Sequence, residues 1–126
     1  GCRFVHWRGR VLVLRELAHA APPVRLAPGT GRLWDRRFAV ALPPAAGEPV
    51  TIGYLGAAGA RELDRRIGRP RHTPLPRLIY PVLPAVRDDR GLLCVPHLGY
   101  RREGAPFPVL LFRPVNPLTT AGFTIV

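Results

Sequence analysis

The chain has 126 residues and a formal net charge of +11, and it contains no lysine, no serine and no methionine. Its length predicts one domain with a buried core, and a hydrophobic fraction of 47% excludes a disordered chain. No apolar run is long enough for a membrane-spanning helix, and Arg3, Arg8 and Arg10 interrupt any signal-peptide core, so we expect a cytoplasmic protein without membrane contact.

The first predicted element is a hairpin. The runs CRFVHW and RVLVLREL flank Arg8-Gly9, where glycine supplies the positive φ of a tight turn. Apolar residues on both faces of residues 11–14 predict a second strand covered on both sides. We expect a single domain over residues 1–126, in which the hairpin at residues 2–17 packs as a separate subelement. A proline- and glycine-rich connection, AHAAPPVRLAPGTG, follows it.

The stretch GRLWDRRFAVALPP predicts a second hairpin. Residues 33–34 form a short strand, residues 35–36 a turn and residues 37–42 a returning strand. The alternation leaves Arg36 and Arg37 facing outward, and the double proline ends the strand. The side chains predicted to pack inward are those of Trp34, Phe38, Val40 and Leu42.

A β-rich run at residues 50–56 precedes the clearest helix, which we predict near residues 57–67. Ala60, Leu63 and Ile67 recur on one side, Glu62 faces Arg66, and Gly68 ends the helix.

Proline punctuates the rest of the chain. The segment TPLPRLIYPVLPAV leaves room for a single helical turn. The segment AVRDDRGLLCVPHLGY predicts a hairpin with DDRG as its turn, and FPVLLF predicts a last strand before a proline-broken tail. The fold class is therefore α+β, with predominantly antiparallel β hairpins and one main helix.

The residue types leave little for catalysis. Without serine or lysine the chain can form neither a Ser-His-Asp triad nor a Schiff base. Asp88 and Asp89 are adjacent and should stabilise a turn. Cys94 and His97 lie three apart in an extended segment, which predicts opposite faces, and both Cys2 and Cys94 should be free thiols. No cysteine or histidine spacing indicates zinc, so we predict no catalytic residue, metal or cofactor.

The positive charge predicts a polyanionic partner, with nucleic acid ahead of an anionic membrane or an acidic neighbouring domain. Arginine pairs bidentately with phosphate, and Tyr100 or Trp34 could add a stacking face. The predicted RNA-binding residues follow the helix and the last hairpin: Arg61, Arg65, Arg66, Arg69, Arg71, Arg101 and Arg102.

Four segments in this order resemble the C-terminal region of tRNA(Ile)-lysidine synthetase in its alphaproteobacterial form: GCRFVHWRGRVLVLRE, LAPGTGRLWDRRFAV, LPAVRDDRGLLCVPHLGY and RPVNPLTTAGF. The patterns WD.RF and GLL.VPHLGY carry most of the resemblance, which covers nearly the whole chain. Two departures are Arg36, where the family often has glycine, and Arg87-Asp88, where a Trp-Asp pair is commoner.

The resemblance implies a role in tRNA modification. The family's enzymes are ATP-dependent ligases that attach lysine to the wobble cytidine of the isoleucine tRNA with a CAU anticodon. Their chemistry belongs to an N-terminal PP-loop domain with an SGGxDS motif, which this serine-free chain lacks. The resemblance thus implies a noncatalytic tRNA-binding domain, whose partners are tRNA and the PP-loop domain. Because the chain begins GCRFVHW, without methionine, we expect a processed or excised piece of a longer protein.

Two other hypotheses stay open. One is a protein-interaction module that braces a catalytic domain or forms a homodimer through its apolar strands. The other is a stand-alone enzyme that acts through Cys94.

Overall fold

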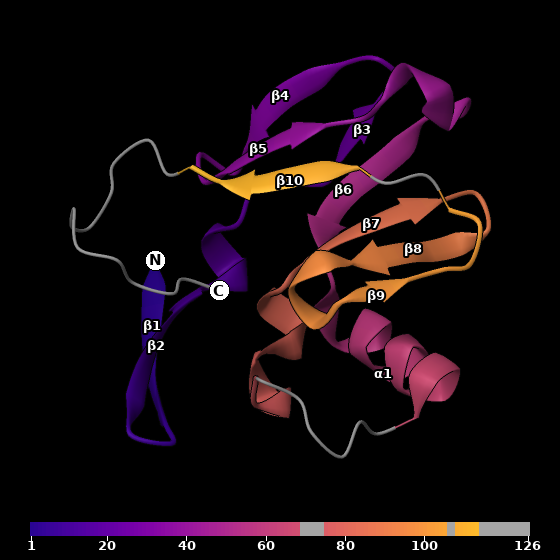
Figure 1. The fold of residues 1–126 in the computed structure, drawn as a ribbon. Helices are drawn as coiled ribbons and strands as arrows, with labels where there is room; N and C mark the ends of the chain where they lie inside the picture. The colour runs from indigo at the N-terminus through magenta and orange to yellow at the C-terminus, as the bar shows by residue number, and fades with distance from the viewer. Residues whose placement is uncertain (69–74, 106–107, 114–126) are drawn as a thin grey trace.

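The computed structural model describes residues 1–68, 75–105 and 108–113 (Figure 1). The expectations for Arg69 and Arg71 and for the tail after Arg113 lie outside the described residues. Ten strands form three antiparallel sheets within the described ranges. The first sheet pairs β1 (Cys2–Trp7) with β2 (Arg10–Arg15).

A three-stranded and a five-stranded sheet make up the body of the molecule. The smaller has the order β10-β5-β4 and the larger the order β3-β6-β7-β8-β9. Their strands are β3 (Val24–Leu26), β4 (Gly31–Trp34), β5 (Phe38–Ala41), β6 (Val50–Tyr54), β7 (Pro84–Asp88), β8 (Gly91–Val95), β9 (Tyr100–Arg101) and β10 (Val109–Phe112). The helical elements are α1 (Gly56–Ile67) and the short 3-10 helices η1 (Leu17–His19), η2 (Pro44–Ala46), η3 (Arg77–Val82) and η4 (Pro96–Leu98).

The five-stranded sheet lies between two other layers, with the three-stranded sheet on one face and α1 on the other (Figure 1). Successive residues of a strand point to opposite faces. In β8, Leu92 accordingly packs with Leu63 of α1, whereas Leu93 packs with Trp34 and Phe38 of the smaller sheet. This arrangement confirms the predicted α+β class with one main helix.

The β1–β2 hairpin turns at Arg8 and Gly9, which both have positive φ, as a two-residue type I′ turn requires. Leu12 and Leu14 are buried in the cluster that also contains η3 and α1 residues, but Val11 on the other face is 48% exposed. The prediction that this strand is covered on both sides is wrong, because a two-stranded hairpin packs here with one face only.

Two other sequence expectations need correction. The connection after the first hairpin contains a strand, β3, which pairs with β6. Its three residues are too few to show a period, and its place at the sheet edge tolerates the prolines beside it. The η3 segment is also longer than the predicted single turn, and it keeps Pro81 inside a 3-10 helix.

The second hairpin has the predicted inward face, since Trp34, Phe38, Val40 and Leu42 are all buried. Arg37, however, does not simply face outward. Its side chain is half-buried, and its guanidinium carbon lies 5.6 Å from the centroid of the Phe38 ring. A long arginine stem can fold back over an aromatic neighbour, which a strict alternation rule does not anticipate.

Helix α1 is joined to the sheet through its first turn. Arg87 of β7 donates a hydrogen bond of 2.8 Å to the carbonyl of Leu55, the residue before the helix. Gly59 makes room for this contact, because a Cβ there would lie 2.8 Å from the Arg87 guanidinium nitrogen. The predicted inner side is confirmed at Ala60 and Leu63, while Ile67 in the last turn is exposed.

Asp35 is the buried charged residue of the described chain, and it joins three separate segments. Arg15 of β2 donates two hydrogen bonds of 3.0 Å to its carboxylate. The Ala21 amide donates another, of 2.9 Å, and the Tyr54 hydroxyl of β6 also donates to it. The carboxylate therefore connects the N-terminal hairpin to both larger sheets.

We expect Asp35→Asn to lower the free energy of unfolding by about 3 kcal/mol, because it leaves a partly buried guanidinium without its counter-ion. Urea denaturation measures this loss. The control is Asp89→Asn at an exposed acid, which should change stability by less than about 0.5 kcal/mol. Equal losses in the two variants would contradict the role given to Asp35.

The same carboxylate should contribute to acid unfolding. Burial raises the pKa of Asp35, but the hydrogen bonds from Tyr54, Arg15 and Ala21 outweigh it, so its pKa in the folded state is lowered. The stabilisation is then present above the unfolded pKa of about 3.9 and is lost as the pH falls below that value. Asp35→Asn should flatten this part of the stability profile, measured by urea midpoints between pH 6 and pH 3.

Candidate nucleic-acid interface

Five of the eight acidic side chains form ion pairs with basic side chains. In the described part of the chain, five ion pairs are formed, and each joins a carboxylate to a basic side chain. The pairs are Asp35–Arg15, Glu16–His19, Glu62–Arg66, Asp64–Arg77 and Asp88–Arg102. The arginines outside these pairs therefore determine which part of the surface attracts a polyanion.

The outward side of α1 carries two of the predicted RNA-binding residues. Arg61 and Arg65 are exposed, lie one turn apart and form no ion pair within the described ranges. Arg66 points differently: it lies 2.8 Å from the Glu62 carboxylate, with which it forms an i,i+4 pair. Hydrogen bonds to Tyr100 and, to a smaller extent, to Glu62 raise the pKa of Arg66.

The end of the larger sheet brings in the other predicted residues. Arg101 is exposed in β9. Arg102 binds both carboxylate oxygens of Asp88, one of them at 3.0 Å, and this interaction raises the pKa of Arg102 and lowers that of Asp88. Asp88 also accepts a hydrogen bond of 2.9 Å from the Arg90 amide, so the prediction that it stabilises the turn is confirmed.

The structure brings the helix and the sheet end together. Arg66 and Arg102 are close enough for their charges to repel, which offsets a small part of the rise in the pKa of Arg102. A Cβ on Gly91, at the β7–β8 turn, would lie 3.4 Å from an Arg66 guanidinium nitrogen. Helix α1 and the end of the larger sheet thus meet at Arg66 and Arg102, and we define the helix surface by Arg61, Arg65, Arg66 and Arg102. Arg101 lies on the other face of the five-stranded sheet, where it pairs with Cys94 of β8.

The aromatic residues divide between core and surface. Trp34 is 2% exposed, and its indole nitrogen donates a hydrogen bond of 3.0 Å to the Pro22 carbonyl, so it has no free stacking face. Its ring lies 5.9 Å from that of Phe38, which is also buried. The half-buried Tyr100 packs against the core and binds Arg66. The prediction that Trp34 packs inward is therefore confirmed, and the alternative that it offers a stacking face is wrong.

Sequence reasoning missed a second group of exposed arginines on the first hairpin. Arg3, Arg8 and Arg10 are exposed, and no ion pair involves them within the described residues. Arg8 lies over the ring of Trp7, with its guanidinium carbon 4.7 Å from the ring centroid. The available signal was the absence of any aspartate or glutamate among the first fifteen residues.

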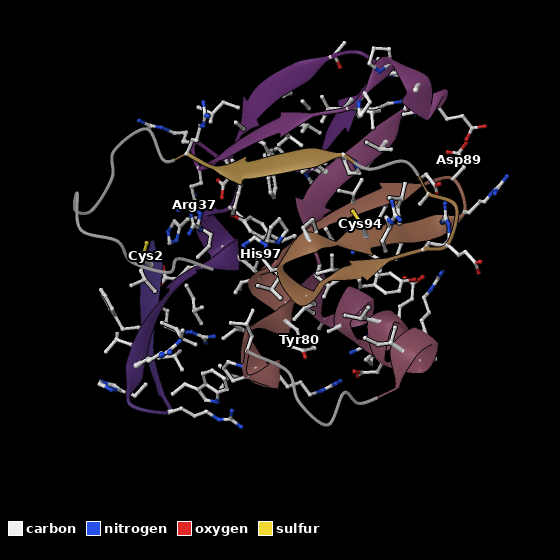
Figure 2. The ribbon with its side chains drawn as sticks, viewed as in Figure 1. Cys2, Arg37, Tyr80, Asp89, Cys94 and His97 are labelled. Carbon is white, nitrogen blue, oxygen red and sulfur yellow. The ribbon has the colours of Figure 1, made fainter. Side chains whose placement is uncertain are left out.

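The Cys94 side chain is buried between the two larger sheets, and burial raises its pKa to about 11. His97 lies against Phe38 instead, with ring centroids 6.1 Å apart, and Figure 2 shows its side chain well away from Cys94. Burial, together with the nearby charge of Arg37, lowers the pKa of His97. This separation offers no Cys-His nucleophile.

A pocket of about 270 Å³ borders Cys94 and is lined mainly by apolar surface, with Tyr100 and Arg101 at its wall. Its volume is below the range of about 300–1,000 Å³ that is usual for small-molecule sites. Among the described residues, no group of three His, Cys, Asp or Glu side chains is placed to bind a metal ion. None of the described helices has the length and apolar character that crossing a membrane requires.

Comparisons of the chain with protein families, with curated proteins and with solved structures found no match.

The two cysteines should differ sharply in reactivity. Cys2 is exposed, whereas Cys94 is buried and has a raised pKa, so its thiolate is scarce near pH 8. We expect iodoacetamide to modify one thiol in the native protein, and Cys2→Ala to abolish this fast reaction. Mass spectrometry of the peptides identifies the modified residue. Rapid native labelling of Cys94 would contradict this prediction and would revive a nucleophilic role.

Proposed function

We propose that this chain is a noncatalytic domain that binds tRNA and positions it for a reaction on another domain. The resemblance stated above suggests the reaction: ATP-dependent attachment of lysine to a wobble cytidine by an N-terminal PP-loop domain of the same cytoplasmic protein. ATP and lysine are then substrates of that domain. This chain would supply the surface that binds RNA.

The observation that carries the proposal is the distribution of charge. The carboxylates pair with arginines that connect elements, such as Arg15, Arg77 and Arg102. Exposed arginines without an ion pair in the described chain remain on several elements: Arg3, Arg8, Arg10, Arg25, Arg32, Arg36, Arg61, Arg65 and Arg90. The positive charge of these arginines is thus presented outward, where phosphates can reach it.

Within the helix surface, Arg61 and Arg65 are best placed to contact phosphate. Both are mounted on a helix whose first turn is fixed by Arg87 and whose inner side is buried at Leu63. A rigid support reduces the entropy lost when an arginine orders on a phosphate. The guanidinium groups of Arg66 and Arg102 are already paired with Glu62 and Asp88. We therefore expect these two arginines to contribute less to the affinity for RNA than Arg61 and Arg65.

The reversal Arg61→Glu with Arg65→Glu should weaken binding of a tRNA(Ile) transcript by at least about tenfold at 100 mM salt. It should also lower the slope of log affinity against log salt by roughly 2, since two phosphate contacts are lost. Filter binding at several salt concentrations gives both quantities.

The matched control is Arg25→Glu with Arg32→Glu, which makes the same change of charge at exposed positions of β3 and β4. Equal losses in the two double variants would show that net charge alone matters and would contradict the helix surface. A wild-type chain that does not bind tRNA at low salt but forms a dimer would support the alternative hypothesis of a protein-interaction module.

A further inference from the structure

The inner face of the first hairpin carries its arginines. In an antiparallel pair, residues that lie directly opposite each other share a face of the hairpin. The register pairs Arg3 with Leu14 and Trp7 with Arg10, and Leu14 is buried in the core. Trp7 also packs against the core, while Arg3 and Arg10 are exposed. The face that attaches the hairpin to the protein therefore has a positive charge at each of its two ends.

At the hairpin turn, Trp7 supports the side chain of Arg8. The indole is half-buried, and the guanidinium carbon of Arg8 lies 4.7 Å from the centroid of its ring. Arg8 is itself exposed, so the second face of its planar guanidinium group is open to solvent. Because the contact with Trp7 restricts this side chain, Arg8 loses less conformational freedom on binding a ligand than an unsupported arginine would.

A second positive charge lies beside this stacked pair. Arg10 is directly opposite Trp7, and the Cβ atoms of such a pair are about 5 Å apart. Neither Arg8 nor Arg10 forms an ion pair within the described ranges, and residues 1–15 contain no aspartate or glutamate. Figure 1 shows the turn at the end of the hairpin that projects away from the three-stranded sheet. A flat cation and a neighbouring point of positive charge are thus presented together.

We propose that the turn of the β1–β2 hairpin binds an unpaired nucleotide of RNA, with its base stacked on the Arg8 guanidinium and its phosphate bound to Arg10. Unpaired bases stack on arginine guanidinium planes as well as on aromatic rings. Arginine also pairs with phosphate oxygens through two parallel hydrogen bonds. Since every base has a face that can stack, the site tolerates different sequences. This inference rests on the proposed RNA-binding function, and it adds that the hairpin holds an unpaired part of the RNA.

Duplex RNA and an anionic membrane are less suitable partners for this turn. Bases in a duplex are stacked on one another and offer no open face to Arg8. Membrane binding would need apolar side chains that can enter the lipid beside the arginines, but Trp7 packs against the core and has Arg8 over its ring. The contact between Arg8 and Trp7 therefore favours a ligand that is flat and also carries a negative charge.

The test uses the full chain and fluorescence anisotropy with three RNAs: a twelve-nucleotide uridine-rich strand, its duplex, and a tRNA(Ile) transcript. Arg8→Lys keeps the charge but removes the planar group on which a base can stack. It should weaken binding of the single strand by about fivefold or more, which is the contribution of one stacked base, and leave the affinity for the duplex unchanged. Arg10→Gln should instead lower the salt slope for the single strand by about 0.7, the share of one phosphate contact.

Matched controls come from another hairpin turn and from the opposite face of the same hairpin. Arg36, like Arg8, is an exposed arginine with a positive φ in a hairpin turn, so Arg36→Lys makes the same substitution elsewhere. Phe4→Ala removes a ring that is 67% exposed on the face opposite Trp7. Both controls should bind the single strand as the wild type does. Urea denaturation of every variant verifies that the fold persists, which is expected because the substituted side chains are exposed.

The outcomes separate this inference from the proposed function. A wild-type chain that binds tRNA, with an Arg8→Lys variant that binds the single strand equally well, overturns the stacking site and leaves the tRNA-binding function standing. An Arg8→Lys variant that loses affinity equally for the single strand and the duplex also overturns the stacking site, as does an equal loss in Arg36→Lys. A wild-type chain that binds no RNA at low salt overturns both the stacking site and the proposed function.

Discussion

The position of the N-terminal hairpin depends on one buried carboxylate. Asp35 lies in the turn between β4 and β5, yet it accepts hydrogen bonds from Arg15 of β2 and from Tyr54 of β6. An ionised group in this location is tolerated because a guanidinium, a hydroxyl and a backbone amide together replace its water. The hairpin is thus held by a directional contact as well as by the burial of Leu12 and Leu14, and the orientation of its arginines follows from that contact.

The small number of acidic residues determines where the surface is positively charged. With eight acidic and nineteen basic residues, few carboxylates are available for purely superficial pairs. Those of Asp35, Asp64 and Asp88 join elements distant in sequence, which leaves Arg61 and Arg65 of α1 and the exposed arginines of the hairpin without an ion pair in the described chain. Fold and charge are therefore linked: the same few acids stabilise the structure and set where it is most positive. A basic domain of this kind can bind a polyanion without any concave site.

Local signals predicted much of the fold. Glycine at the first turn, the alternation through Phe38 and Val40, and the helical spacing of Ala60 and Leu63 each depend on neighbouring residues, and all are confirmed. The features that the sequence did not predict depend on contacts between distant segments. Neither the pairing of β3 with β6 nor the burial of Asp35 has a local pattern, because each arises from a partner at least fourteen residues away. For the candidate site, the sequence indicated basic character and the arginines of α1, but it could not show that Arg102 is committed to Asp88.

The two-stranded hairpin also has a consequence for the behaviour of the protein in storage. Each of its strands has a neighbour on one side only in the described sheets, so the outer edge of each presents free backbone amides and carbonyls. Such edges can add a strand from another molecule, and repulsion between arginine-rich tips is what opposes this. Concentrated salt screens that repulsion. The purified chain should therefore need moderate ionic strength and a charged binding partner to remain dispersed, whereas high salt, often used to strip nucleic acid from basic proteins, should promote its precipitation.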